Sequence, residues 1–138
     1  MTRSRVARLL AGLACFGFLG TAALHSTGYG SVSRLAADVP GVMGQVMPAL
    51  WLVFSVDLTV LGLIVGVLTV RQSDVARPIL VIAAACPLAA AGLQIRFIGF
   101  IPPTALLIGL GALALVGAAT WPPGAGSRTL NAGRDGQP

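Results

Sequence analysis

Residues 49–70 read ALWLVFSVDLTVLGLIVGVLTV, an apolar run in which the polar side chains are small hydroxyl residues and one carboxylate, that of Asp57. A helix that crosses the hydrocarbon core of a lipid bilayer needs about 20 mostly apolar residues. The stretch therefore predicts a membrane-spanning helix, and it is the strongest such signal in the chain.

Three other stretches have a similar composition, namely residues 6–24, 78–95 and 102–121. Proline suits the first turn of a helix, because the N–H that it lacks would have no acceptor there. Pro78 and Pro102 therefore mark helix starts, whereas Pro122 marks a stop. We predict an all-α integral membrane protein in which residues 1–121 form one bundle of four transmembrane helices.

The composition supports this class. Of the 138 residues, 56 % are hydrophobic and 9 % are charged, whereas soluble domains carry about 25 % charged residues. The chain has no Lys, no Glu and a single histidine, His25. A Schiff-base site needs Lys, and a zinc-protease helix needs two His and a Glu, so both are excluded. The arginines are scattered between apolar runs, so we expect no binding to nucleic acid.

The arginines predict the orientation. Seven of them precede the first span, lie between the second and third spans, or follow the fourth: Arg3, Arg5, Arg8, Arg71, Arg77, Arg128 and Arg134. Only Arg34 and Arg96 fall on the other side. Cytoplasmic loops and tails retain positive charge, so we expect both termini in the cytoplasm and the protein in the inner membrane. The tail, residues 122–138, is expected to be disordered.

The connection of residues 25–48 is expected on the outer side of the membrane. Within it, the spacing of one helix face is shown by Val32, Leu35, Ala36 and Val39, which predicts a short interfacial helix that ends before Pro40. A different interpretation of the first span is a cleaved secretory signal. Its apolar run is longer than the usual core of about 7–15 residues in such signals, so we prefer a spanning helix and leave the signal as the alternative.

Asp57 is the group that most needs an explanation. An ionised carboxylate in the middle of a membrane costs about 2.5–3.5 kcal/mol. Counted at 1.5 Å per residue from the outer surface, Asp57 lies level with Cys15 in the first span and with Cys86 and Pro87 in the third. These residues and Ser55 predict a proton or ligand site beside a kinked helix. The alternative is a neutral, hydrogen-bonded Asp57 that fixes the register of the helices.

A second polar group is predicted at the outer ends of the spans. His25 and Tyr29 follow the first span, and Gln94 and Arg96 end the third. Together they could line an outward-facing vestibule, although such residues are also ordinary anchors at the membrane surface. The same depth count places His25 about 13 Å from the level of Asp57, too far for direct contact.

Small residues at helical spacing predict close helix packing. The pairs are Gly62 with Gly66 in the second span and Ala105 with Gly109 in the fourth; such pairs let helix backbones approach closely and also occur at oligomer interfaces. The two thiols without a third strong ligand give little support for a copper site. We therefore expect no metal and no cofactor.

We recognise no family motif, and three functions follow from the residues. The first is a non-catalytic accessory or assembly subunit that packs against a larger membrane protein, or against further copies of itself, within the lipid bilayer. The second is a small transporter or proton-coupled binder centred on Asp57. The third is a lipid-processing enzyme. Catalysis ranks last because the chain offers few convergent polar groups.

Overall fold

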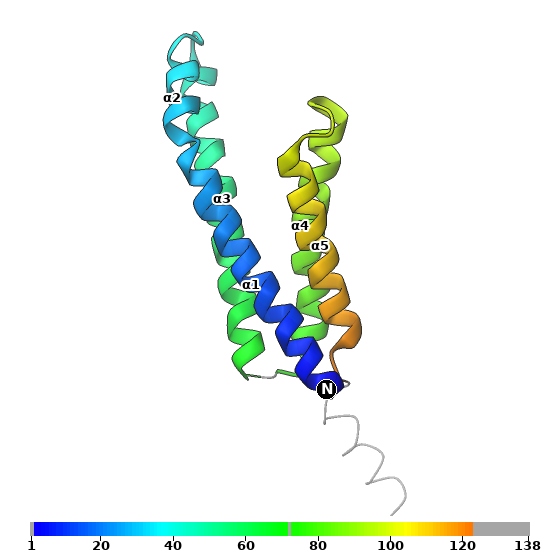
Figure 1. Cartoon of the computed structure of the whole chain (residues 1–138). Coiled ribbons are helices and arrows are strands. Elements are labelled where there is room, and N and C mark those ends of the chain that lie inside the picture. Colours follow the sequence, from blue (N-terminus) through cyan, green and yellow to red (C-terminus); the bar gives the residue numbers. More distant parts are fainter. Residues whose placement is uncertain (1, 72, 123–138) are drawn as a thin grey trace, which may run out of the picture. The chain divides into compact units, whose positions relative to one another are not determined.

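The computed structural model describes residues 2–71 and 73–122, and all of the regular structure there is helical. The helices are α1 (Arg3–Thr27), α2 (Tyr29–Ala37), α3 (Val42–Arg71), α4 (Ala76–Phe97) and α5 (Pro102–Thr120). Figure 1 shows them in chain order. The tail expected to be disordered lies, from residue 123 on, outside the described residues.

Four helical stretches are long and apolar enough to cross a membrane: Arg3–Ala37, which joins α1 and α2, then α3, α4 and α5. The predicted all-helical class and the number of candidate spans are therefore confirmed. The predicted starts at prolines agree for α5, which begins at Pro102. Helix α4 begins two residues before Pro78, whose missing N–H still falls in the first turn, where helical N–H groups have no intrahelical acceptor.

The connection expected over residues 25–48 is mostly helical. Helix α1 continues to Thr27, α2 is the short helix that was predicted before Pro40, and α3 begins at Val42 rather than near residue 49. Pro48 lies inside α3. A proline within a helix removes a backbone hydrogen bond and crowds the carbonyl four residues earlier, but here the residues on both sides of Pro48 continue the helix.

The chain divides into two compact units, and each is described by itself. One unit contains residues 15–64, and the other contains the residues up to Ala14 together with those from Val65 on. In the first unit a tight turn joins α2 to α3. Gly41 adopts φ +72° there, a conformation that glycine reaches without steric cost. A Cβ on Gly44 would lie 2.5 Å from the carbonyl oxygen of Val39, so only glycine fits this turn.

The second unit is built mainly from α4 and α5, which lie side by side (Figure 1). Their contact faces are rich in small side chains, because Ala and Gly let two backbones approach closely. The buried residues of α4 are Ala76, Leu80, Ala83, Ala84, Pro87 and Ala91. Those of α5 are Thr104, Leu107, Leu110, Gly111, Ala114, Gly117 and Ala118. Both sets recur every three or four residues, which places each set on one helix face.

Gly111 and Gly109 form a matched pair for testing this packing. A Cβ added to Gly111 would lie 2.5 Å from Cγ of Leu88, whereas one added to Gly109 would meet nothing within 4 Å. We expect Gly111→Ala to lower the free energy of unfolding by about 1–3 kcal/mol through overpacking. Gly109→Ala should be neutral or stabilising by up to about 1 kcal/mol. Unfolding of the purified protein in detergent micelles measures both, and equal effects would contradict the assigned helix face.

Candidate functional site

Asp57 lies midway along α3, and its side chain is exposed. Within residues 2–71 and 73–122, no side chain or backbone group forms a hydrogen bond or ion pair with its carboxylate. Ser55 and Thr59, two residues away on either side, use their hydroxyl groups elsewhere: Thr59 donates to the carbonyl of Ser55 (2.8 Å), and Ser55 bonds to His25. The described part of the chain therefore offers no partner that would explain this carboxylate.

The surface around Asp57 is apolar. Val53, Val56 and Val60 lie within four residues of it along α3, and each is about half exposed. We call Asp57 and these three valines the Asp57 face. The buried neighbours are Leu58 and Ser55, which lie about 100° and 160° around the helix from Asp57. A lone acid among exposed valines is the reverse of a water-facing surface, where polar side chains predominate.

His25, in the last turn of α1, is the centre of a cluster of polar and aromatic side chains from α1 and α3. Its Nδ1 lies 2.9 Å from the hydroxyl oxygen of Ser55. Its ring stacks on that of Trp51, with the ring centres 4.0 Å apart, and meets the edge of Phe54 at 4.9 Å. The Trp51 Nε1–H also donates to the backbone carbonyl of His25 (2.7 Å). The hydrogen bonds within the cluster satisfy its buried polar groups and join α1 to α3.

This cluster corrects the depth count. His25 contacts Ser55, so along the helix axis it lies only about 3 Å from the level of Asp57. Gly62 lies against Phe18 and Leu19, so Asp57 is level with residues later in α1 than Cys15. The count was wrong because it assumed that the two spans end at residues 24 and 49, whereas α1 and α3 both continue beyond these positions.

The other residues of the predicted vestibule belong to both units. Tyr29 begins α2 and is partly exposed, in the unit that contains His25. In the other unit, the side-chain oxygen of Gln94 accepts a hydrogen bond from the buried Thr104 hydroxyl (2.8 Å). Arg96 places its guanidinium 5.4 Å from the ring centre of Phe97. Gln94 and Arg96 therefore have local contacts within their own unit, and a shared vestibule stays a prediction.

The residues that were grouped with Asp57 in the third span also lie in the other unit. Pro87 is fully buried inside α4, and Cys86 beside it is half-buried. Their grouping with Asp57 stays a prediction. Among the described residues, no three His, Cys, Asp or Glu side chains lie close enough together to hold a metal ion.

The small-residue pairs differ in their surroundings. Gly62 is buried against α1, and Gly66 is half-buried. Ala105 and Gly109 lie on the exposed side of α5, where Gly111 and Gly117 on another face contact neighbouring helices. The spacing alone could not distinguish these faces, because α5 is apolar on all sides.

Two functional features were missed in the sequence. The indole of Trp51 was read only as part of an apolar run, although a buried indole N–H needs an acceptor. The pairing of Gln94 with Thr104 was also missed, because Gln94 was grouped with the vestibule and Thr104 was not considered as a partner. Comparison of the chain with protein-family models, with curated proteins and with solved structures finds no match.

We predict that Ser55→Ala destabilises the protein, because it leaves Nδ1 of His25 without its partner. Hydrogen bonds between membrane helices contribute about 0.6 kcal/mol on average, and up to about 1.7. Thr59→Val is the matched control, because the Thr59 hydroxyl bonds only to its own helix. Unfolding in detergent micelles should show a loss for Ser55→Ala and a smaller one for Thr59→Val. Equal losses would mean that the His25 bond does not join the helices.

Proposed function

We propose that this protein is a non-catalytic, multi-pass inner-membrane subunit that assembles with a larger membrane protein through the Asp57 face. The partner contributes a helix that carries an Arg, a Lys or another hydrogen-bond donor at the level of Asp57. The observation that carries the proposal is the exposed carboxylate in the middle of an apolar helix, with no partner among residues 2–71 and 73–122.

The position of Asp57 along α3 makes exposure to lipid unfavourable. The helix runs from Val42 to Arg71, so Asp57 lies about 20 Å from either end at 1.5 Å per residue. An Asp side chain is too short to reach the headgroups over that distance. Acids inside membranes almost always face a protein interior, a cavity or a partner group. A contact with a second protein would satisfy this requirement.

A partner of different sequence fits better than a second copy of this chain. Every arginine in the described part of the chain lies within two turns of a helix end. A second copy in the same orientation would therefore bring none of its described arginines to the level of Asp57. A different membrane protein with a cation or donor at mid-membrane would complement the charge, as interface pairs generally do.

The orientation proposed for this subunit has both termini in the cytoplasm. The turn between α3 and α4, which contains Asp74, would then face the cytoplasm, and the turn after α2, which contains Asp38, would face outward. Both acids are exposed. The support is the distribution of arginines, because Arg71 and Arg77 flank the first turn and positive charge is retained on the cytoplasmic side.

Replacing Asp57 separates an assembly role from a structural one. We expect Asp57→Leu to leave the stability of the isolated chain unchanged or to raise it in bilayers by up to about 3 kcal/mol, because it removes a carboxylate from apolar surroundings. Association with the partner should fall about a hundredfold or more, because breaking a buried ion pair costs about 3–5 kcal/mol. Unfolding measurements and quantitative co-purification from native membranes test the two effects.

Photo-cross-linking identifies the partner and provides the control. A photoreactive side chain at Val53 or Val60 should cross-link to a protein of different sequence, and Asp57→Leu should abolish the product. The same probe at Leu52, which is exposed but points about 140° away from Asp57 on the helix, should not give that product. A product made only of two copies of this chain would contradict the proposal. So would an intact product in Asp57→Leu.

Transport is tested with a different substitution at the same residue. If the protein carried protons or a small molecule through Asp57, liposomes containing the purified chain alone would show a flux that Asp57→Asn abolishes. We expect no such flux from the isolated chain. A flux that depends on Asp57 would replace the assembly proposal with the transporter.

The orientation is tested by labelling single cysteines with a membrane-impermeant thiol reagent. In a Cys15→Ala/Cys86→Ala background, Asp38→Cys should react when the reagent is added to intact spheroplasts. Asp74→Cys should react only after the membrane is opened. The reverse pattern would invert the proposed topology, and reaction at both positions would mean that the chain does not span the membrane as four helices.

A further inference from the structure

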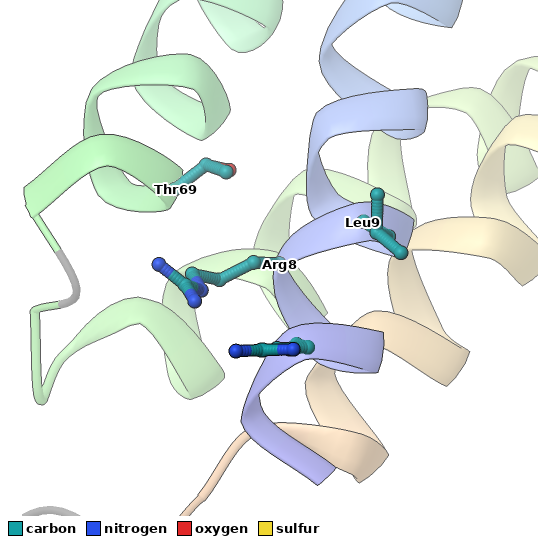
Figure 2. A pocket seen from close by; sticks show the side chains of 4 residues that line it. Arg8, Leu9 and Thr69 are labelled. Atoms are coloured by element: carbon teal, nitrogen blue, oxygen red, sulfur yellow. The ribbon is translucent and has the colours of Figure 1, made fainter. Parts of the chain in front are cut away.

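A pocket of about 400 Å³ lies near the start of α1, lined by Arg5, Arg8, Leu9 and Thr69 (Figure 2). Its four lining residues all belong to the same compact unit, with α1 supplying three of them and the last turns of α3 the fourth. Figure 2 shows the Arg8 side chain extending from α1 toward the helix that carries Thr69. The volume is within the range of small-molecule sites, about 300–1,000 Å³.

The guanidinium groups of Arg5 and Arg8 have no partner in the described part of the chain. Neither Arg5 nor Arg8 forms a hydrogen bond or ion pair through its side chain within residues 2–71 and 73–122. The Nε–H of Arg8 is moreover buried without an acceptor, which is costly for a charged group. Arg3 differs, because its guanidinium donates to the backbone carbonyl of Ala119 (3.1 Å). Two cations with free donors therefore meet in one concave site.

The lining selects for an anion. No acid among residues 2–71 and 73–122 lines the pocket, and Thr69 already donates its hydroxyl hydrogen to the carbonyl of Val65 (2.7 Å). The available donors are then the guanidinium N–H groups, whose planar forks match the oxygens of a phosphate. Leu9 adds an apolar wall that is about half exposed. A ligand with a phosphate at one end and hydrocarbon at the other fits both parts of the lining.

The pocket also lies at the correct height for such a ligand. Arg5 and Arg8 fall in the first two turns of a candidate span that begins at Arg3, and Thr69 lies two residues before the end of α3 at Arg71. In a bilayer these helix ends reach the headgroup region, where basic pockets between helices on the cytoplasmic side bind anionic lipid headgroups.

We propose that this pocket binds the phosphate of an anionic phospholipid, with Arg5 and Arg8 as phosphate ligands and Leu9 against the start of an acyl chain. The assignment rests on the membrane insertion proposed above and is independent of the Asp57 face. Loss of partner binding in Asp57→Leu would leave lipid binding unchanged, so the two proposals fail separately.

The experiment is a native mass spectrometry titration of the full-length chain in detergent, with phosphatidylglycerol and phosphatidylcholine as probes. We expect wild-type protein to retain phosphatidylglycerol in preference to phosphatidylcholine. Arg5→Gln/Arg8→Gln should weaken phosphatidylglycerol binding about tenfold or more, because it removes charge-assisted hydrogen bonds. The matched control is Arg71→Gln/Arg77→Gln, which removes the same charge from exposed positions that do not line the pocket. It should change the affinity by less than about twofold.

Three outcomes would overturn the proposal. Equal weakening in the two double variants would assign the binding to diffuse positive charge. Equal retention of both lipids by the wild type would mean that the pocket does not select a headgroup with a net negative charge. Displacement of the lipid by inorganic phosphate at equal concentration would assign the pocket to a free anion rather than to a lipid.

A second variant keeps the test valid if the glutamine pair does not fold. Arg5→Lys/Arg8→Lys preserves both charges but replaces each planar fork by a point charge. We expect it to fold like the wild type and to bind phosphatidylglycerol more weakly than the wild type. Wild-type affinity in this variant would contradict recognition by the guanidinium forks.

Discussion

The structure depends on one constraint, which is that a backbone surrounded by apolar groups must satisfy its own N–H and C=O groups. A helix does this within a single segment, and the described chain is helical over nearly all of its length. The constraint also explains how Pro48 and Pro87 are tolerated inside α3 and α4. Each costs one helical hydrogen bond, whereas ending the helix would leave several backbone groups unpaired. The hydroxyls of Thr21, Thr59 and Thr69 follow the same rule, since each donates to a carbonyl four residues earlier in its own helix.

Once the helices are formed, polar side chains decide how they are paired. In one unit the pairing depends on His25, Ser55 and Trp51, and in the other on the hydrogen bond from Thr104 to Gln94. Around these bonds the core consists of small Ala side chains and of larger ones such as Phe18, Leu58 and Leu107, none of which carries a polar group. The directional bonds therefore add a polar constraint on helix register to the one that apolar packing gives. Asp57 differs from these residues, because residues 2–71 and 73–122 supply hydrogen bonds to Ser55 and Thr59 beside it but none to its carboxylate.

The number of apolar helices followed from the sequence because hydrophobic length is a local property that each segment carries in its own composition. The start of α5 at Pro102 was predictable for the same reason. The register of α1 against α3 was not predictable, because it depends on where each helix ends, and α3 begins at Val42 rather than near residue 49. The exposure of Asp57 was also not predictable, since α3 is apolar on every side and has no polar face from which to infer direction. The pocket lined by Arg5, Arg8, Leu9 and Thr69 was not predictable either, because Thr69 is at least 60 positions from the other three residues in the chain.

The length of α3 has a mechanical consequence. Its 30 residues span about 45 Å, whereas the hydrocarbon core of a bilayer is about 30 Å thick. The 19 residues of α5 span about 29 Å and match that thickness. In a bilayer α3 must therefore tilt or extend beyond the hydrocarbon core. The tilt of a long helix responds to bilayer thickness, and a short helix cannot follow it without exposing its ends. The membrane itself would then act on the angle at which α3 presents its surface.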